Sequence, residues 1–162
     1  MLFLHLILNR SSGTEMKALI QRVTRAEVLI EGNLYSEIGR GILVLLGVEK
    51  GDTEQDVEYI CRKVLHVRIF EDANKKMNLS AADVKGEFLV ISQFTLSAHC
   101  RKGNRPSFDH AEEPARAREL YLQFTDRLRK TGLLVKTGDF GAHMQVHLVN
   151  DGPVTILLDS KK

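Results

Sequence analysis

The chain has 162 residues, a length typical of one domain with a hydrophobic core of its own. Hydrophobic residues make up 43% and charged residues 27%, as in an ordinary globular protein. The formal net charge of +2 is too small to demand a nucleic-acid partner by itself. Of the two cysteines, Cys61 falls on a predicted apolar helix face and Cys100 in a polar loop. This argues against a disulfide scaffold and for a reduced, cytoplasmic compartment.

The first fifteen residues do not read as part of the domain. Residues 2–8 are apolar except for His5, but seven residues are too few to span a bilayer. A secretory signal would need a basic start and a small-residue cleavage site, and the segment has neither. We therefore predict that residues 1–15 lie outside the fold, that residues 16–162 form a single domain, and that no membrane is involved.

The first half of the chain predicts four strands and one helix. The strands are expected at residues 18–23, 26–30, 34–38 and 41–48. Glu31-Gly32-Asn33 is a turn signal, so the second and third strands should form a hairpin. The nearly continuous apolar fourth strand is typical of one that is buried on both faces. Thr53 can cap a helix whose apolar residues recur at helical spacing. These residues are Val57, Ile60, Cys61, Val64 and Leu65.

The second half predicts a central strand, a second helix and three closing strands. Residues 67–70 read as a short strand and residues 71–78 as a loop. The apolar run 88–96 should be the central strand, and the long loop 97–114 that follows is of a length that is often functional. A helix is expected at residues 115–130 and ends near Gly132. Further strands are expected at residues 133–136, 142–149 and 154–158.

This order of elements favours the α+β (mixed) class over a doubly wound fold, because strands strongly outnumber helices. We predict a curved, barrel-like mixed β-sheet with two helices packed outside it.

Four motifs, in this order along the chain, are similar to those of the D-aminoacyl-tRNA deacylases. They are Met16-Lys17-Ala18-Leu19-Ile20-Gln21-Arg22-Val23, Ser92-Gln93-Phe94-Thr95-Leu96, Arg101-Lys102-Gly103-Asn104-Arg105-Pro106-Ser107-Phe108 and Asn150-Asp151-Gly152-Pro153-Val154-Thr155. The resemblance extends from Met16 to about Ser160. Several ordered matches are far more specific than a lone motif.

The resemblance implies a cytosolic, homodimeric esterase that uses no cofactor. Members of the family hydrolyse the ester between a D-amino acid, or glycine, and the 3′ end of tRNA, and they spare the L-aminoacyl ester. The resemblance also implies a cis bond between Gly152 and Pro153, whose carbonyls enter the partner's pocket. Arg22 would steady this turn, and Met144 would line the pocket. Thr155 closes the same motif and is assigned to substrate binding.

Ester hydrolysis needs a placed carbonyl, a water molecule and donors for the developing oxyanion. We expect the backbone N–H groups near Phe94 and Thr95 to be those donors, with Ser92 and Gln93 positioning the terminal adenosine. Thr95 as a nucleophile is an alternative, although no histidine or carboxylate is near it in sequence. Both motifs could instead have a purely structural role. The first would be a strand end that places Phe94 in the core, and the Gly-Pro segment would be an ordinary hairpin turn.

Two other function classes remain open on the residues alone. A metal-dependent hydrolase could use His143 and His147, with His99, Cys100 and His110, but no zinc-type spacing is present, and we predict no metal. A non-catalytic RNA-binding module would use the basic loop. In the deacylase reading, that loop contacts tRNA phosphates through Arg101, Lys102 and Arg105.

Overall fold

The computed structural model describes residues 15–161. Residues 1–14 of the predicted N-terminal extension lie outside the described residues, as does Lys162. Glu15 is described, and its backbone N–H donates to Glu49 Oε2 at 2.8 Å. The elements in chain order are β1 (Lys17–Ile30), β2 (Asn33–Ile38), β3 (Gly41–Gly47), α1 (Glu54–His66), β4 (Phe70–Glu71), β5 (Met77–Leu79), α2 (Ala81–Val84), β6 (Glu87–Ser92), the 3₁₀ helix η1 (Phe94–Ser97), α3 (Pro114–Arg129), β7 (Val135–Thr137) and β8 (Gln145–Asp159).

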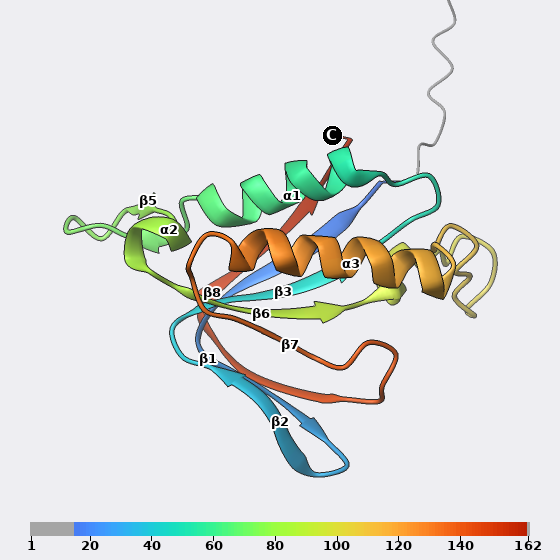
Figure 1. The fold of residues 1–162 in the computed structure, drawn as a ribbon, viewed down its shortest axis with the longest axis horizontal. Helices are drawn as coiled ribbons and strands as arrows, with labels where there is room; N and C mark the ends of the chain where they lie inside the picture. Colours follow the sequence, from blue (N-terminus) through green and yellow to red (C-terminus); the bar gives the residue numbers. More distant parts are fainter. Residues whose placement is uncertain (1–14, 162) are drawn as a thin grey trace, which may run out of the picture.

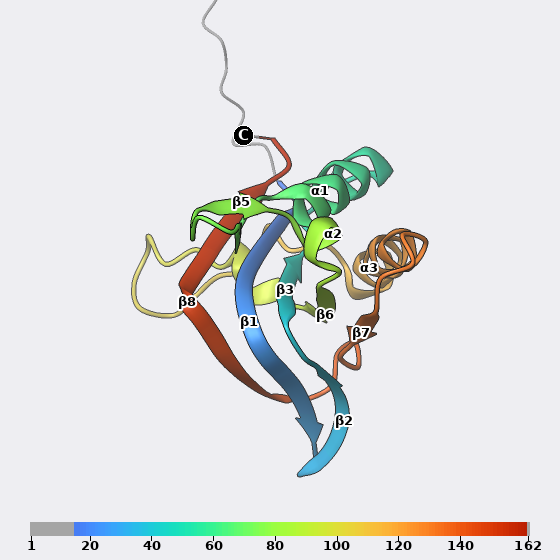
Figure 2. The same cartoon turned by 90° about the vertical axis from the view of Figure 1, so that its left-hand side faces the viewer.

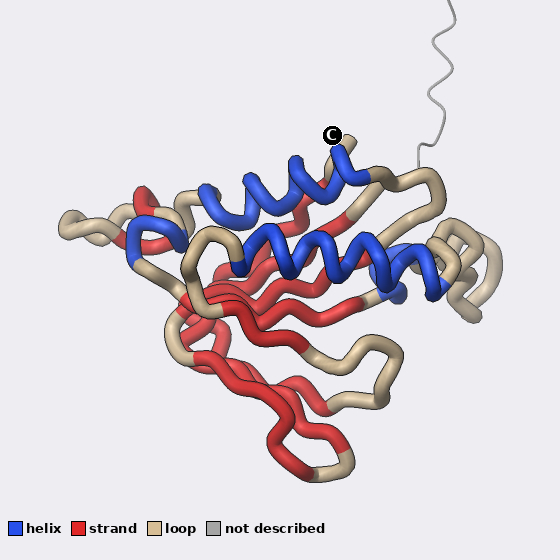
Figure 3. Tube along the Cα trace, in the orientation of Figure 1, coloured by secondary structure: helices blue, strands red, loops and turns tan. Residues whose placement is uncertain are grey.

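One mixed sheet organises the molecule. Its path is β2-β1-β3-β6-β7, with β8 paired to the other edge of β1. The β3–β6 and β6–β7 pairs are parallel, and the pairs that β1 makes are antiparallel. Helices α1 and α3 lie side by side over one face (Figures 1 and 3). The sheet curls away from the helices (Figure 2). Its two end strands come close, since Ser36 Oγ of β2 donates to the Thr137 carbonyl of β7 at 2.8 Å. The predicted curved, barrel-like mixed sheet is confirmed.

Side chains from the two faces of the sheet fill two separate cores. Ile42, Val44 and Leu46 of β3 are buried against the helices. Leu43 points into the second core, inside the curl of the sheet, where Met144 packs at the edge. Successive residues of a strand point to opposite faces, so a strand between two cores must be apolar throughout. This explains the continuous apolar run of β3.

Both long helices form where their apolar stripes predict. Thr53 is the N-cap of α1, and its backbone N–H donates to Asp56 Oδ2 at 2.8 Å, which supplies an acceptor at a helix start. The stripe of α1 is buried except for Leu65, which is partly exposed. On α3, Leu120, Phe124 and Leu128 are fully buried. Two predicted helices are therefore confirmed, and the short α2 and η1 are additional.

Predicted strand bounds were wrong at four places. Residues 18–23 and 26–30 belong to one strand, β1, and residues 145–159 to one strand, β8, although two strands were predicted in each place. Residues 67–70 were predicted as a strand, but only Phe70 belongs to β4, which pairs with β5, a strand that begins inside the predicted loop 71–78 and ends at Leu79. The central strand β6 stops at Ser92 instead of reaching Leu96, because the chain turns into η1.

Helix lengths and composition bear on membrane association as well. In the part of the chain that the structure describes, no helix is both long and apolar enough to cross a bilayer.

Candidate active site

A cavity of about 500 Å³ lies at the carboxyl end of β6, beside the start of α3. Ser92, Gln93 and Phe94 line it on one side, and Met144 lines it on the other. These four predicted site residues therefore meet at one cavity, although Met144 is about fifty positions away in sequence. Ligand sites in sheets with parallel strands commonly lie at the carboxyl ends of those strands.

The turn after β6 leaves backbone donors without acceptors. Gln93 still donates its N–H to the Leu46 carbonyl of β3 at 2.8 Å, and the chain then turns into η1. Within residues 15–161, neither the Phe94 nor the Thr95 N–H has a hydrogen-bond acceptor. Free N–H groups are expected where a strand gives way to a helical turn, because the first turn has no earlier carbonyl to bond. Such groups can accept a ligand's oxygen.

The side chains of the turn face outward. Phe94 is 57% exposed, so the alternative in which it joins the core as the end of a strand is wrong. Its ring meets Phe108 edge to face, with 5.1 Å between centroids, and Phe108 belongs to the long loop before α3. Thr95 is exposed, and its Oγ1 accepts a hydrogen bond from Gln93 Nε2. No base is therefore seen on the Thr95 hydroxyl, which bonds a side-chain amide.

The Gly152–Pro153 segment is a bulge in a continuous strand and not a hairpin turn. Gln21 of β1 faces Thr155, and Val23 faces Asn150, so Arg22 alone stands opposite four residues of β8. Both halves of β8 keep the same direction along β1. The Gly152–Pro153 peptide bond is cis, and Gly152 has φ +141°. A bulge of this kind pushes its backbone out of the sheet while pairing continues on either side.

Arg22 and Gln21 of β1 tie the bulge to the sheet. Arg22 is only 6% exposed, and its Nε donates to the Asp151 carbonyl at 2.9 Å and lies 3.3 Å from the Asp151 carboxylate. Its Nη1 donates to the carbonyl of Ile69 at 2.6 Å. Thr155, at the far end of the bulge, accepts from Gln21 Nε2 at 3.2 Å and from Asn150 Nδ2 at 3.0 Å.

The bulge and the cavity are distant within one chain. Arg22 aligns with Ile42 of β3, and Ile42 with Phe88 of β6, so the bulge lies three strands from β6. At the usual spacing of strands that is about 14 Å across the sheet. Ser92 is a further four residues along β6. The structure thus places the predicted site residues in two groups.

Buried carboxylates lie beyond the end of β3, next to the cavity wall at Val48. Burial raises the pKa of Asp52 to about 6, although its Oδ2 accepts the Glu49 N–H at 2.7 Å. Burial also pushes the pKa of Glu49 upward. Hydrogen bonds from Lys17 Nζ and the Glu15 N–H outweigh that effect and hold the pKa of Glu49 below its ordinary value. This end of the sheet therefore carries one carboxyl that titrates near pH 6.

The remaining candidates lie at the surface. Arg101, Lys102 and Arg105 are exposed in the loop that leads to α3. His99 packs on His110 with 4.4 Å between ring centroids, and His147 Nδ1 lies 3.1 Å from Glu27 Oε1. Among residues 15–161, no group of three histidine, cysteine or acidic side chains could hold a metal ion.

Sequence reasoning missed part of the cavity wall. Glu112 and Pro114, just before α3, line it, as do Phe140 and Ala142 in the loop before β8. Only Pro114, as the first residue of a helix, carried a recognisable local signal. Phe140 and Ala142 follow β7, whose parallel pairing with β6 no local pattern reports. Glu112 is held by its N–H, which donates to the Val48 carbonyl at 3.0 Å.

Comparison with known proteins connects these features to one family. The model of the D-Tyr-tRNA(Tyr) deacylase family matches residues 19–159. A D-aminoacyl-tRNA deacylase of Persephonella marina is 58% identical over 146 residues, which cover 90% of this chain and 99% of that protein. One from Thermotoga petrophila is 56% identical over 147 residues, which cover 91% and 99%.

Solved structures agree. A c-Myc DNA Unwinding Element Binding Protein superposes with a TM-score of 0.83 at 49% identity, covering 88% of this chain and 97% of that one. A probable eukaryotic D-amino acid tRNA deacylase superposes with a TM-score of 0.79, covering 90% and 99%, and at 18% identity it supports the fold alone. From the match over residues 19–159 and the relatives above 50% identity, the chain belongs to the D-Tyr-tRNA(Tyr) deacylase family.

Proposed function

We propose that the protein is an esterase that removes D-amino acids from tRNA. The observation that carries this is an identity of 54–58% over about nine tenths of the chain to several relatives named D-aminoacyl-tRNA deacylase. The cavity beside the Ser92–Thr95 turn gives such an ester a place to bind. By excluding L-aminoacyl esters, the enzyme would correct chirality errors before translation.

The free N–H groups of Phe94 and Thr95 suit the reaction. A water molecule adds to the ester carbonyl carbon, and negative charge develops on the carbonyl oxygen. Two preorganised N–H donors lower the energy of that oxyanion in a site partly screened from water. The bond from carbon to the ribose oxygen then breaks, and the proton from the water passes to that oxygen, assisted by the neighbouring ribose hydroxyl. The products are a free amino acid and a deacylated tRNA.

Discrimination of handedness is assigned to the bulge. The carbonyls of Gly152 and Pro153 would accept hydrogen bonds from the substrate's α-ammonium group and would collide with the side chain of the L-form. Glycine has no side chain, so glycyl-tRNA would also be a substrate. Arg22 supports this role because it holds the bulge rigidly from below. Thr155 and Met144 complete the binding surface of the bulge and of the cavity.

A homodimer would bring the two groups of residues together. Within one chain the bulge lies three strands from β6, so the bulge of one subunit must enter the cavity of the other. Among residues 15–161, β8 pairs with β1 alone, and its outer edge is open along the strand. Val149 and Leu157, on either side of the bulge, are 44% and 51% exposed. An open strand edge with exposed apolar side chains is a surface that favours association.

Contacts with the tRNA itself are assigned to the loop after η1. Arg101, Lys102 and Arg105 are exposed beside the cavity and would bind phosphates near the 3′ end. Their contribution should fall as salt rises. The cytoplasm is the compartment in which this substrate is found.

One assay tests the function. We expect D-Tyr-tRNA to be deacylated and L-Tyr-tRNA to be spared, with the same rate before and after treatment with a chelator. Loss of activity with the chelator would support a metal-dependent hydrolase instead. Equal hydrolysis of the two esters would contradict the chiral role of the bulge.

A second candidate function comes from one relative. The c-Myc DNA Unwinding Element Binding Protein is 49% identical, and its name describes binding to DNA. A nucleic-acid-binding module would use the same basic loop but would not turn over an ester. Binding of D-Tyr-tRNA and of duplex DNA with equal affinity, without release of tyrosine, would favour the module.

A further inference from the structure

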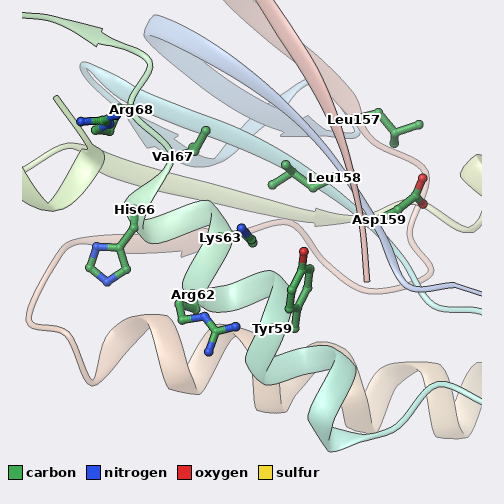
Figure 4. A pocket seen from close by; sticks show the side chains of 9 residues that line it. All are labelled: Tyr59, Arg62, Lys63, His66, Val67, Arg68, Leu157, Leu158 and Asp159. Atoms are coloured by element: carbon green, nitrogen blue, oxygen red, sulfur yellow. The ribbon is translucent and has the colours of Figure 1, made fainter. Parts of the chain in front are cut away.

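A second cavity, larger than the first, lies between α1 and the end of β8 (Figure 4). It measures about 750 Å³. The function proposed above does not use it. Tyr59, Arg62, Lys63 and His66 line it from one side of α1, and Arg68 follows just after the helix. Leu157 and its neighbours on β8 form the opposite wall. We call this cavity the α1–β8 groove.

The groove is strongly cationic. Positions 59, 62, 63 and 66 recur at helical spacing, so one face of α1 presents one aromatic ring and three basic side chains. Arg62 Cζ and Lys63 Nζ lie 5.6 and 5.5 Å from the centre of the Tyr59 ring. None of the ion pairs found in residues 15–161 involves Arg62, Lys63 or Arg68. Asp159 is the one carboxylate in the wall, so positive charge dominates.

This chemistry matches a strand of nucleic acid. Arginine and lysine bind phosphate oxygens, and an aromatic ring with exposed apolar side chains beside it can take a ribose or a base face. Tyr59 provides that ring, and Leu158 is the partly exposed apolar side chain on the α1 side of β8 (Figure 4).

Its position relates the groove to the substrate. Arg68 is followed directly by Ile69, whose carbonyl accepts Arg22 Nη1 at 2.6 Å, and the same arginine holds Asp151 of the bulge. The groove therefore adjoins the bulge, and it lies beside whichever ester cavity the bulge serves. An RNA chain whose 3′ end occupies that cavity would exit the cavity next to the groove.

We infer that the α1–β8 groove binds the sugar–phosphate backbone of the tRNA whose ester is being hydrolysed. This inference rests on the proposed function. The groove supplies affinity for the RNA body and takes no part in the chemistry at the ester. It would act in addition to the basic loop Arg101–Arg105, from the opposite end of the subunit.

The double variant Arg62→Ala/Lys63→Ala tests the inference. Both side chains are exposed, so the fold should be unchanged. We expect KM for D-Tyr-tRNA to rise about ten-fold at 0.1 M salt, and the slope of log KM against log salt to fall by about 2, one for each lost phosphate contact. The kcat should stay as in the wild type. Hydrolysis of D-tyrosyl-adenosine, which has no phosphates, should be unaffected.

The matched control is Lys130→Ala/Lys136→Ala, which removes two exposed lysines at the end of α3 and on β7. It has the same change in net charge and should leave KM and the salt slope nearly unchanged. Unaltered KM and slope in the groove variant would overturn the inference, as would an equal effect of both double variants. A groove that serves an acidic protein or a free nucleotide would give the first of these results.

Failure of the inference can be told from failure of the proposed function. If the wild type does not hydrolyse D-Tyr-tRNA or D-tyrosyl-adenosine, the proposed function is wrong. If the wild type hydrolyses both and the groove variant behaves like it, only the groove assignment is wrong.

Discussion

The turn after β6 and the bulge in β8 are both interruptions of a strand, but they are held in different ways. Backbone bonds fix the turn: Gln93 still pairs with Leu46, and η1 follows at once. Side chains hold the bulge: the buried Arg22, which stands opposite four residues, donates to the Asp151 carbonyl, and Asn150 Oδ1 accepts the Val154 N–H. A feature held by the backbone tolerates side-chain changes, whereas one held by side chains does not. The chemistry of the turn should therefore be robust, and the selectivity of the bulge should be fragile.

Removal of Arg22 should have the largest effect on stability and selectivity of the changes considered. Arg22→Ala leaves the carbonyls of Ile69 and Asp151 without their donor, and the bond to Ile69 is buried. We expect the free energy of unfolding to fall by about 3 kcal/mol, as for the loss of a buried charged hydrogen-bond donor. Selectivity for D- over L-Tyr-tRNA should fall with it.

Denaturant unfolding and paired deacylation assays measure the two effects. Arg25→Ala is the matched control, because Arg25 lies on the same strand but is exposed. Arg25→Ala should lower the free energy of unfolding by no more than about 0.5 kcal/mol. Equal losses in the two variants would show that Arg22 does not hold the bulge.

A side chain at Gly152 should distort the bulge itself. The Cβ of Gly152→Ala would lie 2.7 Å from Val154 Cγ2 and 2.9 Å from the Val154 nitrogen, at a φ of +141° that L-residues rarely adopt. We expect the free energy of unfolding to fall by about 2 kcal/mol and the selectivity for D- over L-Tyr-tRNA to fall clearly. Gly32→Ala is the control, since Gly32 has φ +77° with open space around it. Unchanged selectivity at position 152 would remove the chiral role from the bulge.

The two regions should also respond differently to pH. The pKa of Asp52, which lies near the turn and not near the bulge, is raised by burial to about 6. The folded state then holds this proton more tightly than the unfolded state. The contribution is therefore favourable at low pH and is lost as pH rises from about 4 to about 6.

Asp52→Asn removes the carboxyl that binds this proton. The stability of the variant relative to the wild type should increase by about 2 kcal/mol between pH 4 and pH 7. Urea unfolding of both proteins at several pH values measures the difference. A constant difference across this range would mean that Asp52 titrates normally in the folded protein.

The smallest effect is expected at the turn. Thr95→Val removes a hydroxyl that accepts from Gln93 Nε2, but it keeps the Thr95 N–H. If the backbone stabilises the oxyanion, kcat should fall less than about ten-fold, which is about 1.4 kcal/mol. Thr95→Ser separates the hydroxyl from the shape of the side chain. Complete loss of turnover in the valine variant with D-Tyr-tRNA still bound would identify Thr95 as a catalytic side chain.

Local patterns predicted those parts of the fold that local interactions decide. The spacing of apolar residues predicted α1, α3 and β3, because apolar residues recur on the face that each element buries. The Gly-Pro pair reads as the end of a strand, yet β8 continues past it, because pairing with β1 resumes on the far side. Phe94 fits a strand pattern and is instead exposed, because its position depends on where β6 turns.

The site was predictable to the extent that its residues form motifs. Ser92, Gln93, Phe94 and Met144 do meet at one cavity. Glu112, Phe140 and Ala142 were missed, because they reach it through loops whose position depends on distant pairing. The distance between the cavity and the bulge also follows only from the order of strands in the sheet.

The length of β1 has a consequence for how the gene can vary. This single strand pairs with β2 and β3 along one edge and with β8 along the other. An inserted or deleted codon within Lys17–Ile30 would exchange inward and outward side chains against three neighbours at once. Length changes should therefore be almost prohibited in this stretch. The exposed loop Arg101–Arg105, which sets no such alignment, should accept them.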